Sequence, residues 1–172
     1  MDKVYFALGP TFTVVAHDAG AVTRFPRYLG IMALITRNTD RALLVLRLAV
    51  ATSFVVHGWT KLFVMGHAGV EGFFVSLGVP LPGIAAWAVS LLEFAGGLAL
   101  VVGIFTRAIS LLFVFDMLTA IALAVFPKGF MGGWELEFLL ASASLCLALA
   151  GGGAYSLDAW LASHRFTGDR SS

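Results

Sequence analysis

The stretch AISLLFVFDMLTAIALAVF, residues Ala108–Phe126, is apolar at most positions and carries one ionisable side chain, Asp116. An α-helix rises about 1.5 Å per residue, so a stretch of this length approaches the thickness of a bilayer's hydrocarbon core, about 30 Å. It therefore predicts a membrane-spanning helix. Three further stretches have the same character and predict three more spans: Ala42–Phe63, Ile84–Phe105 and Gly133–Ala150.

The composition agrees with a membrane protein. Hydrophobic residues make up 59% of the 172 residues, charged residues make up 12%, and the mean hydropathy is +0.92. Soluble domains are about half apolar and about a quarter charged. The later links between the predicted spans are short, which makes consecutive helices antiparallel neighbours. The sequence thus predicts an all-α fold, an integral membrane four-helix bundle of a plasma or inner membrane.

The distribution of apolar and charged residues divides the chain into three parts. Residues 1–40 mix charges with two apolar pieces, Val4–Ala16 and Tyr28–Ile35, which are too short to cross a membrane. We predict a cytoplasmic N-terminal extension, whose second piece either lies on the membrane surface or belongs to a disordered tail. Pro10 interrupts the first piece and no clear cleavage site follows, which disfavours a signal peptide. Residues 41–160 form the transmembrane domain, and residues 161–172 form a cytoplasmic tail.

Basic residues indicate the orientation of the bundle, because Lys and Arg are retained on the cytoplasmic side of short loops. Lys61 and Lys128 fall at the ends of spans on one side of the predicted bundle. Eight basic residues fall on the other side, and we therefore predict that both termini are cytoplasmic: Lys3, Arg24, Arg27, Arg37, Arg41, Arg107, Arg165 and Arg170.

Several classes of partner and cofactor are disfavoured. A net charge of +1 provides no basic surface for nucleic acid. The lone cysteine, Cys146, forms no C-x-x-C pair and is expected to be a small buried hydrophobe. A bis-histidine haem needs two inward-facing histidines, and only His57 lies within a span. We predict no metal site and no intrinsic cofactor.

Ionisable side chains inside a span cost roughly 2.5–3.5 kcal/mol each on insertion scales, so they should face the bundle interior and find partners. Counting residues inward from the predicted span ends places Glu93 and Asp116 near mid-membrane and Arg47 in the inner third. We expect Arg47 to reach both carboxyl groups and form a buried polar network. Structural pairing alone is an equally good explanation of this network.

A second polar layer is expected near the outer ends of the first and fourth spans. His57, Lys61 and Glu137 are predicted to be catalytic, because an imidazole and a carboxylate at this depth can exchange protons with a quinone head group. Trp59, Trp134 and Glu135 are predicted to bind the substrate. The alternatives are interfacial anchoring for the tryptophans and plain ion pairing for the charges.

Two features bear on packing. Ala95, Ala99 and Gly103 form a small-xxx-small ridge, which suits close helix contact or a dimer face. The first link, Gly66–Gly83, contains a short amphipathic piece, Val70–Leu77, which we expect to rest at the membrane interface and to cover the outer layer.

The segment from Arg47 to Asp158 resembles the DoxX family, small four-span membrane proteins linked to thiosulfate:quinone oxidoreductase and to membrane redox complexes. Asp116 stands at a position that is usually apolar in the family pattern, and residues 1–40 are additional. The resemblance rests on six segments: HGWTK (57–61), FFVSLGVP (73–80), EFAGGLALVVGIFTR (93–107), PKGF (127–130), GGWEL (132–136) and YSLD (155–158).

The resemblance implies the membrane subunit of a quinone-linked redox complex, which holds a quinone as its only possible cofactor and accepts electrons from a redox partner subunit. Two other classes stay open from the sequence. One is a non-enzymatic membrane scaffold or interaction protein, for which the polar layers only hold the bundle together. The other is a small-solute transporter, which four spans without an evident inverted repeat would form more readily as a homo-oligomer.

Overall fold

The structure is a computed structural model that describes the backbone of residues 11–15 and 22–165 and the side chains of residues 38–164. The chain divides into two compact units, Met1–Thr39 and Asp40–Ser172, which are described separately here. Most of the apolar piece Val4–Ala16 and most of the predicted tail 161–172 lie outside the described residues.

The first unit contains a two-stranded antiparallel sheet. Strand β1 (Thr11–Val15) pairs with β2 (Val22–Pro26), so that Thr11 lies opposite Pro26. Helix α1 (Arg27–Trp59) begins directly after β2, and the backbone of the piece Tyr28–Ile35 is therefore helical.

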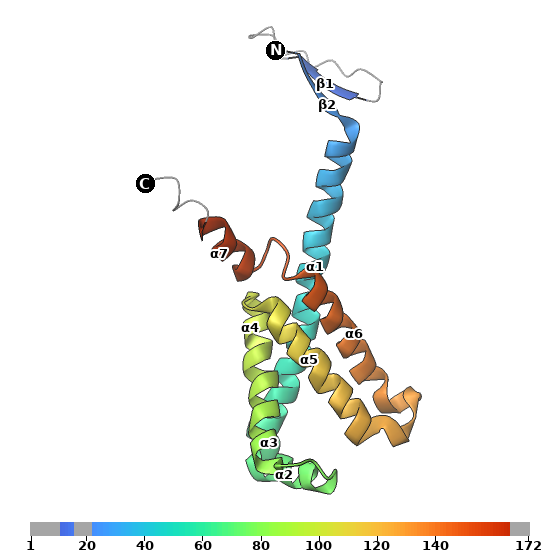
Figure 1. Ribbon diagram of the computed structural model, residues 1–172, viewed down its shortest axis with the longest axis vertical. Coiled ribbons are helices and arrows are strands. Elements are labelled where there is room, and N and C mark those ends of the chain that lie inside the picture. The colour runs from blue at the N-terminus through green and yellow to red at the C-terminus, as the bar shows by residue number, and fades with distance from the viewer. Residues whose placement is uncertain (1–10, 16–21, 166–172) are drawn as a thin grey trace. The chain divides into compact units, whose positions relative to one another are not determined.

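The second unit is helical and contains the four predicted spans (Figure 1). In the described part of the chain, four helical segments are long and apolar enough to cross a membrane: Asn38–Ser76, Pro82–Val102, Thr106–Lys128 and Phe130–Ala150. This confirms the predicted four-span fold. Their faces away from the bundle expose large apolar side chains, among them Phe115 and Leu149, each 72% exposed, as contact with lipid requires.

Each span is built from several consecutive helical pieces. The first consists of α1, the π-helical turn η1 (Thr60–Met65) and α2 (Gly66–Ser76), and the second of α3 (Pro82–Leu91), the π-turn η2 (Leu92–Gly96) and α4 (Gly97–Val102). The third span consists of α5 (Thr106–Ala120), η3 (Ile121–Val125) and η4 (Phe126–Lys128). The fourth consists of η5 (Phe130–Trp134) and α6 (Glu135–Ala150). The last helix of the described chain is α7 (Leu157–Arg165).

Helix ends explain where the spans differ from their predicted limits. The second span was expected to continue to Phe105, but α4 stops at Val102, because Gly103 adopts a left-handed conformation with φ of 79°. The first span bends at Gly66, where φ is 70° and ψ is 166°, and α2 then lies across the end of the bundle (Figure 1). The expected amphipathic piece Val70–Leu77 is thus mostly part of this helix.

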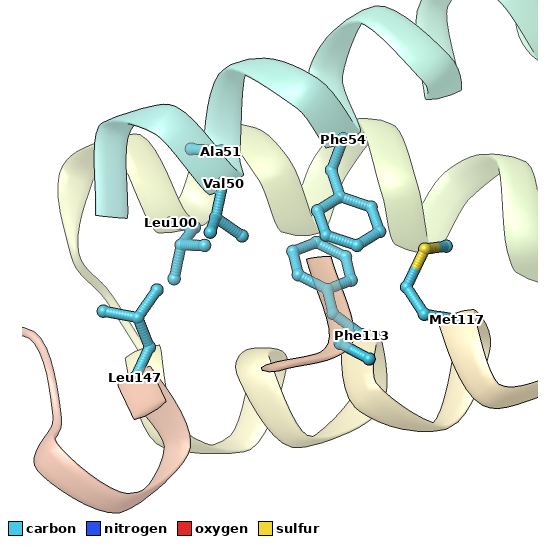
Figure 2. Close-up of a cluster of buried hydrophobic side chains, with 8 residues drawn as sticks. Val50, Ala51, Phe54, Leu100, Phe113, Met117 and Leu147 are labelled. Atoms are coloured by element: carbon cyan, nitrogen blue, oxygen red, sulfur yellow. The ribbon is translucent and has the colours of Figure 1, made fainter. Parts of the chain in front are cut away.

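A layer of apolar side chains joins the spans (Figure 2). Phe54 from α1 and Phe113 from α5 stack with their ring centroids 3.6 Å apart and their planes 7° from parallel, and both are almost completely buried. Further members from all four spans surround this pair: Val50, Ala51, Leu100, Met117, Ala141 and Leu147.

Glycine rather than the predicted alanine ridge allows the first two spans to approach closely. A Cβ atom on Gly58 would overlap the backbone of Phe94, and one on Gly97 would lie 2.8 Å from the Val55 side chain. Ala95 of the predicted Ala95, Ala99 and Gly103 ridge is exposed, so it does not pack within the bundle, and the alternative of a dimer face stays a prediction. The π-turn η2 inserts an extra residue per turn, so the regular helical spacing that defined the ridge does not hold.

Candidate functional site

A cavity of about 230 Å³ lies between the four spans, with α2, the last helix of the first span, contributing to its wall. Phe54 and Met117 of the apolar layer contribute to it, so this layer closes the cavity toward the other end of the bundle. Most of the wall is apolar. Its polar side chains come from all four spans: His57, Lys61, Glu93, Asp116, Thr119 and Glu137.

An ion pair between Lys61 and Glu93 connects the first and second spans at the cavity. The Glu93 side chain is only 2% exposed and that of Lys61 is 21% exposed. Both residues lie in π-turns, Lys61 in η1 and Glu93 in η2. Such turns re-aim side chains relative to a regular helix and occur frequently at functional sites. The ion pair therefore depends on a local irregularity in each of its two helices.

Two further carboxyl groups extend the cluster. Asp116 of α5 interacts with the charges of both Glu93 and Lys61. Its Oδ2 atom is buried and has no hydrogen-bond partner among the described residues, and the same is true of Oε2 of Glu137 in α6. Both residues line the cavity, but these two oxygens are themselves enclosed by protein atoms rather than open to it.

Aromatic side chains from α2 cover one side of the cavity. Phe73 and Phe74 line it, together with Leu77 from the following turn. Helix α2 is held against α3 by His67, whose ring stacks on that of Trp87 with centroids 4.8 Å apart. His57 belongs to the cavity wall but is exposed, so it marks a place where the cavity communicates with its surroundings.

The structure brings together residues that the sequence assigned to two separate layers. His57, Lys61 and Glu137, predicted to be catalytic, line the same cavity as Glu93 and Asp116, predicted to belong to a buried network. The predicted substrate-binding residues Trp59, Trp134 and Glu135 are not among the described residues that line it. Trp59 packs against Phe63 with ring centroids 4.3 Å apart, and Trp134 meets Phe130 edge-on at 4.6 Å.

The expected pairing of Arg47 with Glu93 and Asp116 is wrong. The Arg47 guanidinium is buried and donates hydrogen bonds to the backbone carbonyls of Gly152 (3.3 Å) and Tyr155 (2.8 Å). The antiparallel register explains this outcome, because the guanidinium lies against Gly103, which is ten residues, or about 15 Å of helix, from Glu93. Lys61, fourteen residues after Arg47, is the cation that meets Glu93.

Arg47 thus belongs to a structural cluster at the opposite end of the bundle. Asp158 accepts hydrogen bonds from the backbone N–H groups of Phe105 and Thr106, each at 2.8 Å, and so caps the start of α5. Asp40 accepts one from Ala154 at 2.9 Å. These contacts hold the segment after the fourth span against two others, the start of the first span and the link between the second and third spans.

Cys146 also differs from the expectation. It is exposed rather than buried, because α6 turns Ala141, Ser144 and Leu147 toward the bundle. Among the described residues, no group of three or more histidine, cysteine or acidic side chains is arranged to hold a metal ion.

Comparison with known proteins identifies the family. The DoxX family model matches residues 42–126, and a protein of Bacillus subtilis named as the putative oxidoreductase CatD is 35% identical over 115 residues, which cover 67% of this chain and 83% of that protein. The chain belongs to the DoxX family. Among its DoxX relatives, the Escherichia coli inner membrane protein YphA is 34% identical over 126 residues, covering 67% of this chain and 87% of YphA.

Another relative, the Escherichia coli inner membrane protein YqjF, is 37% identical over 125 residues, covering 69% of this chain and 91% of YqjF. No solved structure matches the chain. With four spans and relatives of this kind, this DoxX protein is a multi-pass protein of the inner (plasma) membrane, in contact with the lipid bilayer.

Proposed function

We propose that this protein is the membrane subunit of a quinone-linked oxidoreductase complex and that the cavity holds the quinone head group. The observation that carries the proposal is the cavity itself, where an ion pair and the side chains of His57, Asp116 and Glu137 interrupt a largely apolar and aromatic wall. Ligand sites typically combine such a wall with a few convergent polar groups. The relative named as a putative oxidoreductase agrees with redox chemistry.

The cavity supplies what a quinone needs from a protein. Phe54, Phe73 and Phe74 provide apolar surface for the ring. His57 and Lys61 provide N–H donors for a carbonyl oxygen. Reduction of a quinone takes two electrons and two protons, and the side chains of the cavity exchange the protons while a redox partner subunit supplies the electrons.

A steric block tests the proposal. Ala120 lines the cavity, whereas Ala122, two residues later, is exposed. Ala120→Phe should fill the head-group space and abolish binding of decylubiquinone to the purified protein in nanodiscs, measured by titration calorimetry. Ala122→Phe carries the same change outside the cavity and should bind like the wild type.

His57→Ala tests the polar part of the site in the same assay. The loss of one hydrogen bond, worth roughly 0.5–1.5 kcal/mol, should weaken binding about two- to tenfold while the bundle stays folded. Absence of decylubiquinone binding to the wild-type protein, or unchanged binding in Ala120→Phe, would refute the quinone site and favour a membrane scaffold.

A further inference from the structure

Charged and apolar side chains of the cavity differ in how far they are enclosed. The Glu93 side chain is 2% exposed and that of its partner Lys61 is 21% exposed. Three large apolar side chains line the same cavity and are much more exposed, which places them at its opening: Phe73 (44%), Leu123 (46%) and Leu136 (47%). The ion pair therefore lies in the enclosed part of the cavity, and apolar surface lies at the opening. An apolar opening is stable where it meets lipid rather than water.

Two polar residues also line the cavity and are exposed, Thr119 and His57. The Thr119 hydroxyl donates a hydrogen bond to the carbonyl oxygen of Phe115 at 2.9 Å, so its polar group is satisfied within its own helix. His57 belongs to the first span. On the third span, the opening therefore presents mainly apolar contact.

Leu123 lies within the membrane-spanning part of the third span, five residues before Lys128, or about 7.5 Å of helix. It belongs to the π-turn η3, so a third π-turn contributes to this cavity beside η1 and η2. Leu118 and Phe126, on either side of Leu123 in the sequence, are 53% and 63% exposed, as contact with lipid requires. The cavity thus opens onto the lipid-facing surface of the third span.

We infer that the ligand enters this cavity sideways from the bilayer, polar head first, and carries a hydrocarbon chain that stays at the opening against Leu123. This inference rests on the proposed function and deepens it. The quinone head group reaches His57 and Lys61, while the chain contacts Phe73, Leu123 and the surrounding lipid. The site therefore selects quinones that carry a long apolar chain, and Leu123 is a residue that determines this selectivity.

The test separates the chain from the head group. Decylubiquinone carries an alkyl chain, whereas ubiquinone-0 has the same head group without one. Leu123→Trp places a large ring at the opening and should weaken decylubiquinone binding to the full-length protein in nanodiscs about tenfold, as the loss of about two methylene contacts would. Binding of ubiquinone-0 should change less than about twofold. Each probe is compared between proteins in the same bilayer, so its partition into lipid cancels.

Leu118→Trp is the matched control, because Leu118 is exposed on the same span and is not among the described residues that line the cavity. This variant should bind both probes like the wild type. An unchanged affinity of Leu123→Trp for decylubiquinone, or equal weakening of both probes, would overturn the inference while leaving the quinone site intact. Failure of decylubiquinone to bind the wild type would instead reject the proposed function.

A photolabel locates the chain without any substitution. Decylubiquinone with a diazirine within its alkyl chain should label the wild-type protein between Thr119 and Phe126, as identified by mass spectrometry of its peptides. An excess of unlabelled decylubiquinone should suppress this labelling. Suppressible labelling confined to other spans would show that the chain leaves the cavity elsewhere and would overturn the inference.

Discussion

Glu93 carries a carboxyl group into the bundle interior, and Lys61 is the side chain that compensates its charge. Taking the two groups out of water costs several kcal/mol each, which their mutual attraction repays only while both are present. Breaking a buried pair by removing one partner therefore destabilises a protein by about 3–5 kcal/mol, whereas replacing both partners by apolar side chains of similar volume is often neutral.

This contrast gives a prediction for the Lys61–Glu93 pair. Lys61→Met and Glu93→Met should each lower the free energy of unfolding by about 3 kcal/mol, and Lys61→Met/Glu93→Met should regain most of that loss. Unfolding by SDS in mixed micelles measures all four proteins. Glu71→Gln, in the more exposed His67–Glu71 pair, is the control and should cost less than about 1 kcal/mol. Additive losses in the double variant would show that the two charges are not coupled.

For single residues, the sequence predicted which ionisable side chains lie in the bundle better than it predicted which of them pair with each other. The cost of charge in a membrane singled out Lys61, Glu93 and Asp116 without any structure. Their partners could not be obtained by counting residues along straight helices, because η1 and η2 change the spacing at both ends of the ion pair. Arg47 was misassigned for another reason: its hydrogen bonds go to backbone carbonyls, which every residue type provides.

At the scale of helices, the contact between α1 and η2 depends on a missing side chain. Gly58 faces the backbone of Phe94, so that even a methyl group would overlap atoms that cannot rotate away. Gly58 lies three residues before Lys61 of η1, and Phe94 directly follows Glu93 in η2. Close approach at Gly58 therefore positions both partners of the ion pair.

Gly58→Ala should separate α1 from η2 and destabilise the protein by about 1–3 kcal/mol, as overpacking of a filled core does. Gly72→Ala is the control, since a Cβ atom there meets nothing within 4 Å and alanine favours a helix over glycine. Thermal unfolding in detergent compares the two variants. Equal stability of Gly58→Ala and the wild type would mean that the two helices separate without cost.

Hydropathy predicted the four spans well because each needs a long apolar stretch, but it located their ends less accurately. Gly103 and Phe105, both inside the predicted second span, adopt positive φ values and form the link to α5. The bend at Gly66 likewise follows from a backbone angle that an apolar pattern does not encode. The glycines mark these places in the sequence, but many other glycines lie within helices.

In the whole molecule, three segments meet at one end of the bundle: the start of the first span, the link between the second and third spans, and the segment after the fourth span. The hydrogen bonds of Arg47, Asp40 and Asp158 hold them together. Helix α2 ends the first span and Lys128 ends the third span, both at the opposite end of the bundle. The distribution of basic residues predicts that the Arg47 end is cytoplasmic.

Reporter fusions check this orientation. Alkaline phosphatase, which is active only outside the cytoplasm, should be inactive when fused after Arg107 or after Ser172 and active when fused after Lys128. A fluorescent protein that folds only in the cytoplasm should give the reverse pattern. Phosphatase activity of the Ser172 fusion would place the Arg47 end outside.

The apolar layer around Phe54 and Phe113 also bears on the electrical balance of the proposed redox reaction in the cavity. In the proposed function, protons for quinone reduction reach the cavity from the α2 end, because the apolar layer closes the cavity toward the Arg47 end. Electrons would enter wherever the proposed partner subunit docks. Docking at the α2 end brings both charges from one side, and turnover is electroneutral. Docking at the Arg47 end separates them and charges the membrane. In the proposed complex, the side on which the partner subunit binds therefore decides whether turnover charges the membrane.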